Sequence, residues 1–369
     1  MNLHIFNPEH EIALADGGRH PNYGHNVREM RMNLGWLPAL WAHSGDIVLV
    51  DDAAYAVKAC AGYRHDGNEK TAAGIASCKR IHMADVLFLE TSDIRGQHFD
   101  NVIPWGWDLA LTTSLADARI NADNIPDDNK IKEIKTAASR QRTTDALKEI
   151  RYGIEERTCG EAVYLTSAED LSAIGRKVVV KSPWSSSGRG VRYIETGNVS
   201  DNTRRWINNV IRRQGGIMAE PYYNKVKDFA MEFHITDGVT EYCGLSLFHT
   251  YNGGYAGNLI TTEKEKIRKL ERYLSAGLIE DVKRRICDYA DRHLARIYDG
   301  PFGVDMMIVG DGAFLLHPCV EINLRRTMGH VALSLPASDA LPDRVMKIEH
   351  NVNYRIKISE PENNFVQTL

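Results

Sequence analysis

The stretch "VEINLRR", residues 320–326, constrains the fold more than any other part of the chain, because its polar and apolar residues alternate strictly. In an extended strand Glu321, Asn323 and Arg325 project from one face, and the apolar residues between them project from the other. The apolar face predicts burial against a core. The polar face then presents oxygen ligands that suit Mg²⁺ on nucleotide phosphates, beside an arginine that suits an anionic intermediate. An ordinary solvated strand face is the alternative.

A second informative stretch is the loop "KSPWSSSGRGV", residues 181–191, which follows the β-branched run "RKVVV". The run predicts a buried strand that ends at Lys181. The small residues after it offer hydroxyl and unhindered N–H groups, and Lys181 and Arg189 add positive charge, which together suit a polyphosphate. A flexible surface turn is the alternative, because the glycine spacings of the common nucleotide-binding loops are absent.

Composition excludes several classes of protein. The chain has 369 residues, a net charge of -4 and scattered Lys and Arg residues, which predicts more than one lobe and no nucleic-acid partner. Its six cysteines include no C-x-x-C pair, which favours reduced thiols and a cytoplasmic location. The first residues lack the features of a signal peptide, and no apolar run is long enough for a membrane span.

The order of predicted elements favours an α/β lobe followed by a β-rich part. Short strands are expected at 3–6, 46–52 and 84–90, with an amphipathic helix over 27–42 between the first two. A polar segment at 121–130 marks a boundary, and a helical stretch over 131–150 follows it. Further strands are expected within 216–250, a helix over 280–298, and a β-hairpin over 300–326 that turns at Gly310–Gly312.

The order of these motifs resembles the ATP-grasp superfamily of carboxylate ligases. A basic residue ends a strand before a small-residue loop, and then come "EPYY", a Gly-x-Asp strand and "EINLR". The resemblance implies an α/β and α+β fold, with an N-terminal α/β pre-ATP-grasp domain followed by a two-lobed ATP-grasp domain. The implied divisions are 1–125 for the first domain, 130–219 for the small lobe, 220–335 for the large lobe with the metal site, and 336–369 for a C-terminal tail packed on the body.

The resemblance also implies roles for individual residues in binding ATP. Lys181 is similar to the family lysine on the α- and β-phosphates, and residues 185–190 to the loop that closes over the triphosphate. Arg140 stands where the family often has an earlier phosphate-binding lysine, and the change keeps the charge but alters the geometry. The full implied set is Arg140, Lys181, Ser185, Ser186, Ser187, Gly188, Glu220, Pro221, Tyr223 and Asp228.

Within that set, Glu220 is similar to the acceptor of the adenine amino group, and Pro221 and Tyr223 to the backbone hinge contacts. Asp228 resembles the acidic residue on the ribose hydroxyls, although it lies one residue later than the commonest spacing. The implied Mg²⁺ ligands are Asp305, Glu321 and Asn323. Arg325 resembles the residue that steadies the acyl phosphate, and it is the expected catalytic residue together with Lys181.

The hairpin register tests this assignment. A two-residue turn at Asp311 and Gly312 would place Asp305 opposite Pro318, three residues short of Glu321. An odd offset would turn Glu321 to the wrong face. Because proline cannot donate to the ladder, we expect a bulge at "HPC" to restore the register, with residues 317–319 protruding.

Three other stretches lie outside this pattern of motifs. The loop 7–25 contains His10, His20 and His25 among acidic residues but lacks the H-E-x-x-H pattern of a zinc site, and it is expected either to line a substrate crevice or to be a plain turn. The stretch 247–258, with its two adjacent glycines, is either a substrate loop or an aromatic turn. The motif "PWGWD", residues 104–108, is expected to be packing.

These features favour an ATP-dependent ligase that joins a carboxylate to an amine or thiol through an acyl phosphate, with ATP and Mg²⁺ as cofactors. The carboxylate is a small molecule or a peptide, and no nucleic acid or membrane is an expected partner. A nucleotide-binding regulator without turnover, and a small-molecule kinase that uses the same site, are the alternatives. The sequence leaves the identities of both substrates and the oligomeric state open.

Overall fold

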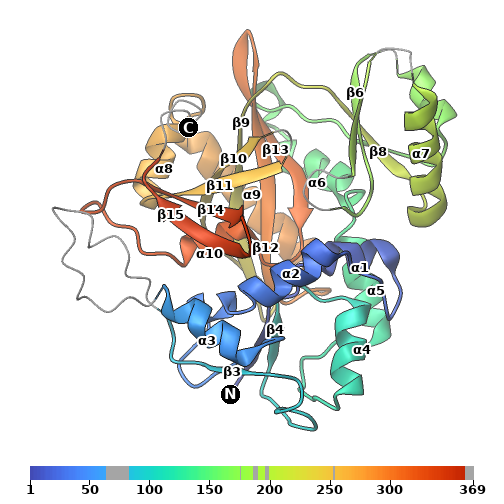
Figure 1. Cartoon of the computed structure of the whole chain (residues 1–369). Helices are drawn as coiled ribbons and strands as arrows, with labels where there is room; N and C mark the ends of the chain where they lie inside the picture. The colour runs from blue at the N-terminus through green and yellow to red at the C-terminus, as the bar shows by residue number, and fades with distance from the viewer. Residues whose placement is uncertain (64–82, 175, 186–189, 196–198, 252–253, 362–369) are drawn as a thin grey trace.

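The structure is a computed structural model, and it describes the whole chain except residues 64–82, 175, 186–189, 196–198, 252–253 and 362–369 (Figure 1). The implied loop residues Ser186, Ser187 and Gly188 therefore lie outside the described residues. One parallel and two antiparallel sheets organise the rest of the chain. The α/β and α+β fold class expected from the sequence is confirmed.

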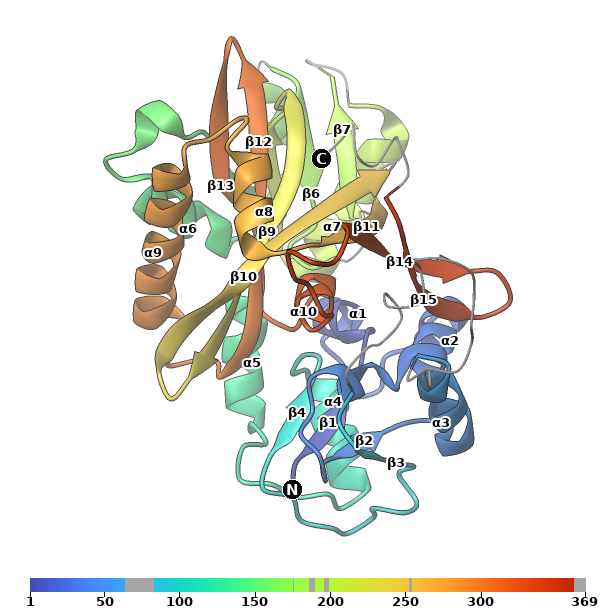
Figure 2. The same ribbon diagram turned by 90° about the vertical axis from the view of Figure 1, so that its left-hand side faces the viewer.

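The N-terminal part contains a parallel sheet in the order β3-β2-β1-β4, which lies at the lower end of the molecule in Figure 2. Its strands are β1 (Leu3–Ile5), β2 (Ile47–Leu49), β3 (Leu87–Leu89) and β4 (Val102–Pro104). Its helices are α1 (His10–Asp16), α2 (His25–Leu34), the 3-10 helix η1 (Leu37–Leu40), α3 (Ala53–Ala61), α4 (Leu109–Asp117) and α5 (Asp128–Ala137). The helix expected over 27–42 ends earlier, at Leu34, and a 3-10 turn replaces its second half, because Gly35 and Pro38 interrupt the α-helical backbone.

A small antiparallel sheet follows, in the order β5-β8-β6-β7. Its strands are β5 (Val163–Leu165), β6 (Val178–Lys181), β7 (Val191–Ile194) and β8 (Ile217–Pro221). The helices of this region are α6 (Arg142–Arg151), the 3-10 helices η3 (Glu155–Arg157) and η4 (Glu169–Ala173), and α7 (Asp201–Gln214). Helix α7 packs on this sheet through Ile207 and Val210, which belong to an apolar core separate from the cores of the other sheets.

The central sheet has the order β13-β12-β9-β10-β11-β14-β15. Its strands are β9 (Lys225–Thr236), β10 (Val239–Tyr251), β11 (Gly254–Ile260), β12 (Gly300–Asp311), β13 (Ala313–Asn323), β14 (Arg344–His350) and β15 (Tyr354–Ser359). The accompanying helices are α8 (Glu263–Leu270), α9 (Ala276–His293) and α10 (Met328–Leu333). Among the helices of the described residues, none is both long and apolar enough to cross a membrane.

The hairpin of β12 and β13 differs from the predicted register by one residue. It turns on Gly312 alone, whose φ of +73° favours glycine, and Asp311 pairs with Ala313. Met307 pairs with His317, but the next pair is Asp305 with Glu321. One residue of β12 therefore lies opposite three residues of β13, 318–320, and this bulge places Asp305 opposite Glu321. The expected bulge near "HPC" is confirmed and restores the register.

The expectation that residues 317–319 protrude is wrong. His317, Pro318 and Cys319 are all buried. The ring of Tyr223 meets the His317 ring edge-on at 5.5 Å, and Gly160 covers it so closely that an added Cβ would come within 2.9 Å of Nε2. The segment after α6 thus packs over the bulge.

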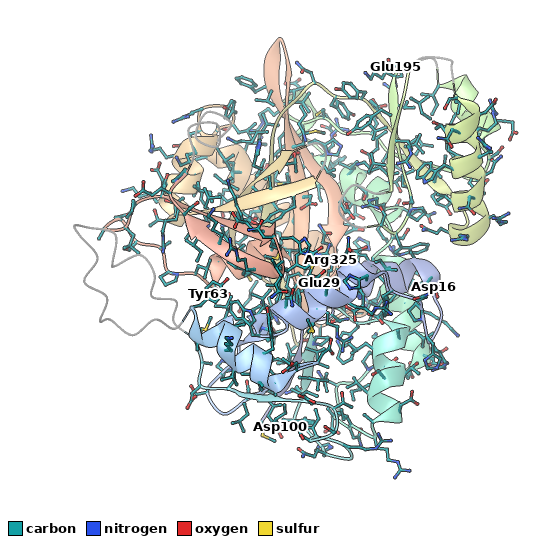
Figure 3. The ribbon with its side chains drawn as sticks, in the orientation of Figure 1. Asp16, Glu29, Tyr63, Asp100, Glu195 and Arg325 are labelled. Carbon is teal, nitrogen blue, oxygen red and sulfur yellow. The ribbon has the colours of Figure 1, made fainter. Side chains whose placement is uncertain are left out.

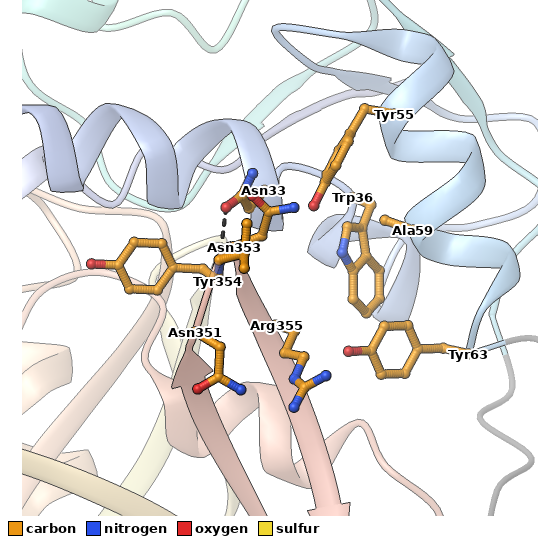
Figure 4. A pocket seen from close by; sticks show the side chains of 10 residues that line it. Asn33, Trp36, Tyr55, Ala59, Tyr63, Asn351, Asn353, Tyr354 and Arg355 are labelled. Carbon is orange, nitrogen blue, oxygen red and sulfur yellow. Dashed lines mark hydrogen bonds between the residues drawn. The ribbon is translucent and has the colours of Figure 1, made fainter.

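The C-terminal hairpin β14–β15 packs against α2 and the following residues. Asn33 Oδ1 accepts a hydrogen bond from the backbone of Tyr354 at 2.8 Å, beside a pocket of about 330 Å³ whose walls include Trp36, Tyr55 and Tyr63 (Figure 4). The Trp36 and Tyr63 rings stack with centroids 4.6 Å apart. The C-terminal hairpin is therefore tied to α2 of the N-terminal part.

Candidate active site

The candidate site lies on one face of the central sheet, where β9, β12 and β13 run side by side. Asp305 pairs with Ala230 on one side and with Glu321 on the other, so these two carboxyls face each other across neighbouring strands. Asn323 is two residues further along β13 on the same face. The metal ligands expected from the sequence are therefore adjacent in the structure.

The chemistry of this donor set fits Mg²⁺ rather than a metal that needs a full protein cage. In the described part of the chain, no three His, Cys, Asp or Glu side chains gather as a ready-made metal site. Two carboxyls and an amide oxygen are what Mg²⁺ uses when substrate phosphates supply its other ligands. We therefore keep Asp305, Glu321 and Asn323 as the residues that would hold it.

Electrostatics support a cation at this position. Burial and the neighbouring carboxylates of Glu321 and Glu232 raise the pKa of Asp305 to about 7, although a hydrogen bond with Asn323 and the charge of Arg325 act in the opposite direction. A carboxyl that ionises so poorly is costly to keep charged in the absence of a counter-ion. A divalent cation between the two strands would remove that cost.

Arg140 connects the acidic face to the small sheet. It precedes α6, and its guanidinium lies 2.7 Å from the Glu321 carboxylate while donating to the Ser182 carbonyl at 2.7 Å. It also donates to the Ser185 hydroxyl and carbonyl, at 2.8 and 2.9 Å. Burial alone would lower the pKa of Arg140, but the nearby carboxylates, Glu321 foremost, outweigh burial and raise it. One permanently charged group therefore joins the serine loop to a proposed metal ligand.

Lys181 and Glu220 are ion-paired with each other. Lys181 ends β6 and Glu220 lies on the adjacent β8, with Nζ and Oε2 2.6 Å apart and both side chains largely buried. The Glu220 carboxylate neutralises the charge of Lys181 in this structure. A phosphate would have to take over this lysine, and its arrival would release Glu220 for another partner.

Two residues expected to contact the base and ribose of ATP, Tyr223 and Asp228, lie between β8 and β9 and on β9. Tyr223 follows β8 and packs on His317, whose ring nitrogens have no partner among the described residues. Burial, with the charges of Lys181 and Arg151, lowers the pKa of His317 to about 3, so its ring is neutral. Asp228 lies on β9, two residues from the position opposite Asp305, and accepts hydrogen bonds from Lys225 and Thr250.

Arg325 leaves the end of β13 and reaches the N-terminal part of the chain. Its Nε donates to Glu11 Oε1 on α1 at 2.8 Å, and its Nη2 donates to Asn323 Oδ1 at 2.9 Å. Figure 3 labels Arg325 where the central sheet meets the N-terminal helices. The arginine expected to steady an anionic intermediate thus bridges a proposed metal ligand and the first helix. The charge of Arg325 is the chief factor that lowers the pKa of Glu11, against its burial.

Sequence reasoning missed two polar residues of this region. Glu232 is buried on the same face of β9, beside His330 Nδ1 at 3.1 Å, and an added Cβ on Gly329 would come within 1.8 Å of its carboxylate. Asp108, at the end of "PWGWD", lies beside His10. The strict alternation of β9 could have indicated Glu232, whereas nothing local to Asp108 shows that it meets His10.

The structure shows how "PWGWD" and the stretch 247–258 pack. Trp105 and Trp107 are buried, which confirms that the tryptophans of "PWGWD" are packing. In the stretch 247–258, Asn258 is buried and donates to Ser246 Oγ at 2.7 Å, and Tyr255 donates to Asn258 Oδ1 at 2.5 Å.

No family model and no curated protein sequence matches the chain. Solved structures similar to it include N5-carboxyaminoimidazole synthetase from Staphylococcus aureus in complex with ADP, at 11% identity and a TM-score of 0.49 over 94% of this chain and 82% of that one. Biotin carboxylase from Campylobacter jejuni is 13% identical, with a TM-score of 0.48 over 94% of this chain and 75% of that one. A putative ATP-grasp superfamily protein from Archaeoglobus fulgidus is 10% identical, with a TM-score of 0.48 over 98% of this chain and 100% of that one. At these identities and TM-scores the matches carry no argument about the function of this chain.

Proposed function

We propose that the protein is an ATP-dependent ligase, which activates a carboxylate as an acyl phosphate and transfers the acyl group to a second substrate. The observation that carries the proposal is the position of Arg140, which contacts both the serine loop and Glu321. A triphosphate bound there would lie between a cationic loop and a pair of carboxyls suited to Mg²⁺. The bound metal would neutralise the phosphate oxygens.

The side chains of the site have distinct roles in this reaction. Lys181 and Arg140 would bind phosphate oxygens and balance their charge, and Glu220, Tyr223 and Asp228 would bind the base and ribose. Asp305, Glu321 and Asn323 would hold Mg²⁺.

The substrate carboxylate attacks the γ-phosphorus, the bond to the bridging oxygen of ADP breaks, and Arg325 stabilises the resulting acyl phosphate. The second substrate then displaces phosphate. No protein nucleophile is required, so positioning and charge supply most of the rate enhancement.

The decisive experiment measures ADP release from MgATP by the purified protein, with pooled carboxylic acids crossed against pooled amines, amino acids and thiols. The variant Glu321→Gln is the blank, because it removes a metal ligand while keeping the size of the side chain. We expect ADP release that needs one acid pool and one acceptor pool and that is lost in the variant. Release with a single pool would identify a kinase, and MgATP binding with no release would support a regulator.

A further inference from the structure

A second polar cluster lies at the carboxyl edge of the parallel sheet, between β1 and β4. The chain runs from β1 to β2 on one side and returns to β4 on the other, and ligands of α/β sheets bind where the strand order reverses in this way. Asn7, Glu9 and His10 follow β1, and Gly106 and Asp108 follow β4. These five residues define what we call the switch-point cluster.

The switch-point cluster is held together by its own hydrogen bonds. Asn7 Nδ2 donates to the Gly106 carbonyl at 2.8 Å and to Asp108 Oδ2 at 3.1 Å, and Asn7 Oδ1 accepts from the Gly106 amide at 3.3 Å. The Gly106 backbone lies so close to the His10 ring that an added Cβ would come within 2.7 Å of it. The cluster is therefore preformed rather than assembled on binding.

His10 in this cluster has one unfilled position, and it is an acceptor. Nδ1 lies 3.3 Å from Asp108 Oδ2, and Asp108 already accepts from Asn7 and from the backbone of Leu111. The proton of the ring therefore belongs on Nδ1, facing the carboxylate, and Nε2 carries a lone pair. Nε2 is buried and has no hydrogen-bond partner among the described residues.

Glu9 has a second unfilled acceptor. One of its oxygens accepts from Arg31 at 2.6 Å, whereas Oε2 is buried and without a hydrogen-bond partner in the described part of the chain. Burial raises the pKa of Glu9, with Arg31 acting in the opposite direction. Buried polar atoms are nearly always paired, and both unpaired atoms here need a donor. A ligand with several N–H donors could supply a partner to each atom.

Contacts link the cluster to the candidate active site. Glu11, next to His10, binds Arg325, and the backbone amide of Arg326 donates to the Trp105 carbonyl at 2.8 Å. The end of β13, which carries Asn323, is thus bonded to both loops that form the cluster. A ligand in the cluster would lie next to the residues that hold the acyl phosphate.

We propose that the switch-point cluster binds the acyl acceptor and that this acceptor is a primary amine rather than a thiol. The proposal rests on the ligase function proposed above and narrows its second substrate. An amine offers several N–H donors to Glu9 and His10, whereas a thiol offers one weak donor. Its positive charge before reaction also suits Asp108, whose only ion-pair partner among the described residues is His10.

His10 then has a defined role in the transfer. As the amine nitrogen bonds to the acyl carbon, the bond from that carbon to the phosphate oxygen breaks, and phosphate leaves with the bonding electrons. The ammonium group first gives one proton to His10 Nε2, which frees the lone pair that attacks, and Asp108 stabilises the imidazolium that forms. The second proton lost by the nitrogen leaves with the phosphate.

Hydroxylamine separates acceptor recognition from acyl phosphate formation. It is a small nucleophile, uncharged at neutral pH, that traps acyl phosphates as hydroxamates and needs neither a specific site nor a base. ADP release is measured with the active acid pool and either the amine pool or hydroxylamine, for the wild type, Glu9→Gln and His10→Asn. His20→Asn is the matched control, because His20 is an exposed histidine that lies between α1 and α2.

We expect the ratio of amine-dependent to hydroxylamine-dependent rate to fall about 100-fold in His10→Asn, the scale of general base catalysis, and about tenfold in Glu9→Gln. The control should keep the wild-type ratio. A wild-type ratio in His10→Asn and Glu9→Gln, whether or not both rates fall, would contradict the proposed acceptor site. Release supported by thiols and not by amines would do the same.

The outcomes also separate this proposal from the ligase function. If the wild type forms no hydroxamate with any acid, the ligase function fails, and the acceptor site fails with it. If the wild type forms hydroxamate and the variants keep the wild-type ratio, only the acceptor site fails. Glu9→Gln keeps both the size of the side chain and an oxygen for Arg31, so it carries the test if His10→Asn does not fold.

Discussion

Asp305→Asn should stabilise the metal-free protein while it abolishes turnover. Asp305 has a pKa near 7 in the folded protein instead of the ordinary 3.8, chiefly because it is buried, and next because it faces Glu321. A carboxyl with a raised folded-state pKa costs nothing below the unfolded pKa and opposes folding increasingly as the pH rises from about 4 to about 7. At about 1.36 kcal/mol per pH unit, the cost is about 4 kcal/mol at pH 8 and about 2 kcal/mol at pH 5.

The assay is urea unfolding followed by far-ultraviolet circular dichroism, in EDTA, at pH 5 and pH 8. We expect Asp305→Asn to raise the free energy of unfolding by about 2 to 4 kcal/mol at pH 8, and by less at pH 5. Added Mg²⁺ should stabilise the wild type and not the variant. Asp123→Asn, at an exposed position, is the control and should change neither value.

Two results would refute this reasoning. A variant no more stable than the wild type at pH 8 would show that the two carboxyls do not oppose folding. A gain that is the same at pH 5 and pH 8 would show that ionisation of Asp305 is not its cause.

Two further predictions concern the N-terminal part of the chain. Gly106→Ala should lower the free energy of unfolding by about 1 to 3 kcal/mol, because the new methyl group would overlap the buried ring of His10. The control Gly277→Ala, which has open space around it in α9, should be neutral or stabilising by about 1 kcal/mol. Urea unfolding of both variants measures the difference, and equal effects would contradict the overlap. Asp46→Asn should cost about 2 kcal/mol at pH 7, because hydrogen bonds from two backbone amides and from His4 outweigh burial and lower the pKa of Asp46 to about 2. That stability is complete above about pH 4 and is lost as the pH falls toward 2, so the difference between variant and wild type should shrink over that range, and a difference independent of pH would contradict it.

The parts of the fold that sequence predicts well are those that depend on local pattern. The alternation in "VEINLRR" placed Glu321 and Asn323 on one face, and the structure confirms this placement opposite Asp305. The bulge was expected at a proline that cannot donate, and it is present, but the parity argument for it is wrong. It assumed a two-residue turn, whereas the observed turn would leave Asp305 opposite Cys319, an even two residues from Glu321. The burial of His317 did not follow, because the residues that cover it come from a different part of the chain.

The contacts that sequence could not predict are those between distant segments. Arg140 and Glu321 are 181 residues apart, and His10 and Asp108 are 98 apart. Each pair depends on how separate elements pack, and neither partner carries a local pattern that identifies the other. Arg140 was expected beside phosphate from the resemblance alone, and its link to Glu321 came only from the structure.

The separate apolar core of the small sheet has a mechanical consequence. Ile207, Val210 and their neighbours form a core of their own, whereas the core of the central sheet continues into the N-terminal part through residues such as Leu3 and Trp107. Tilting the small sheet would therefore expose little apolar surface and would break mainly polar contacts, such as those that Arg140 makes to Ser182 and Ser185 after β6. Polar contacts reform readily in water, so we expect that the small sheet can swing as a rigid body while the proposed acyl and acceptor sites stay in place. Nucleotide entry and product release would then need no rearrangement of the body that holds the substrates.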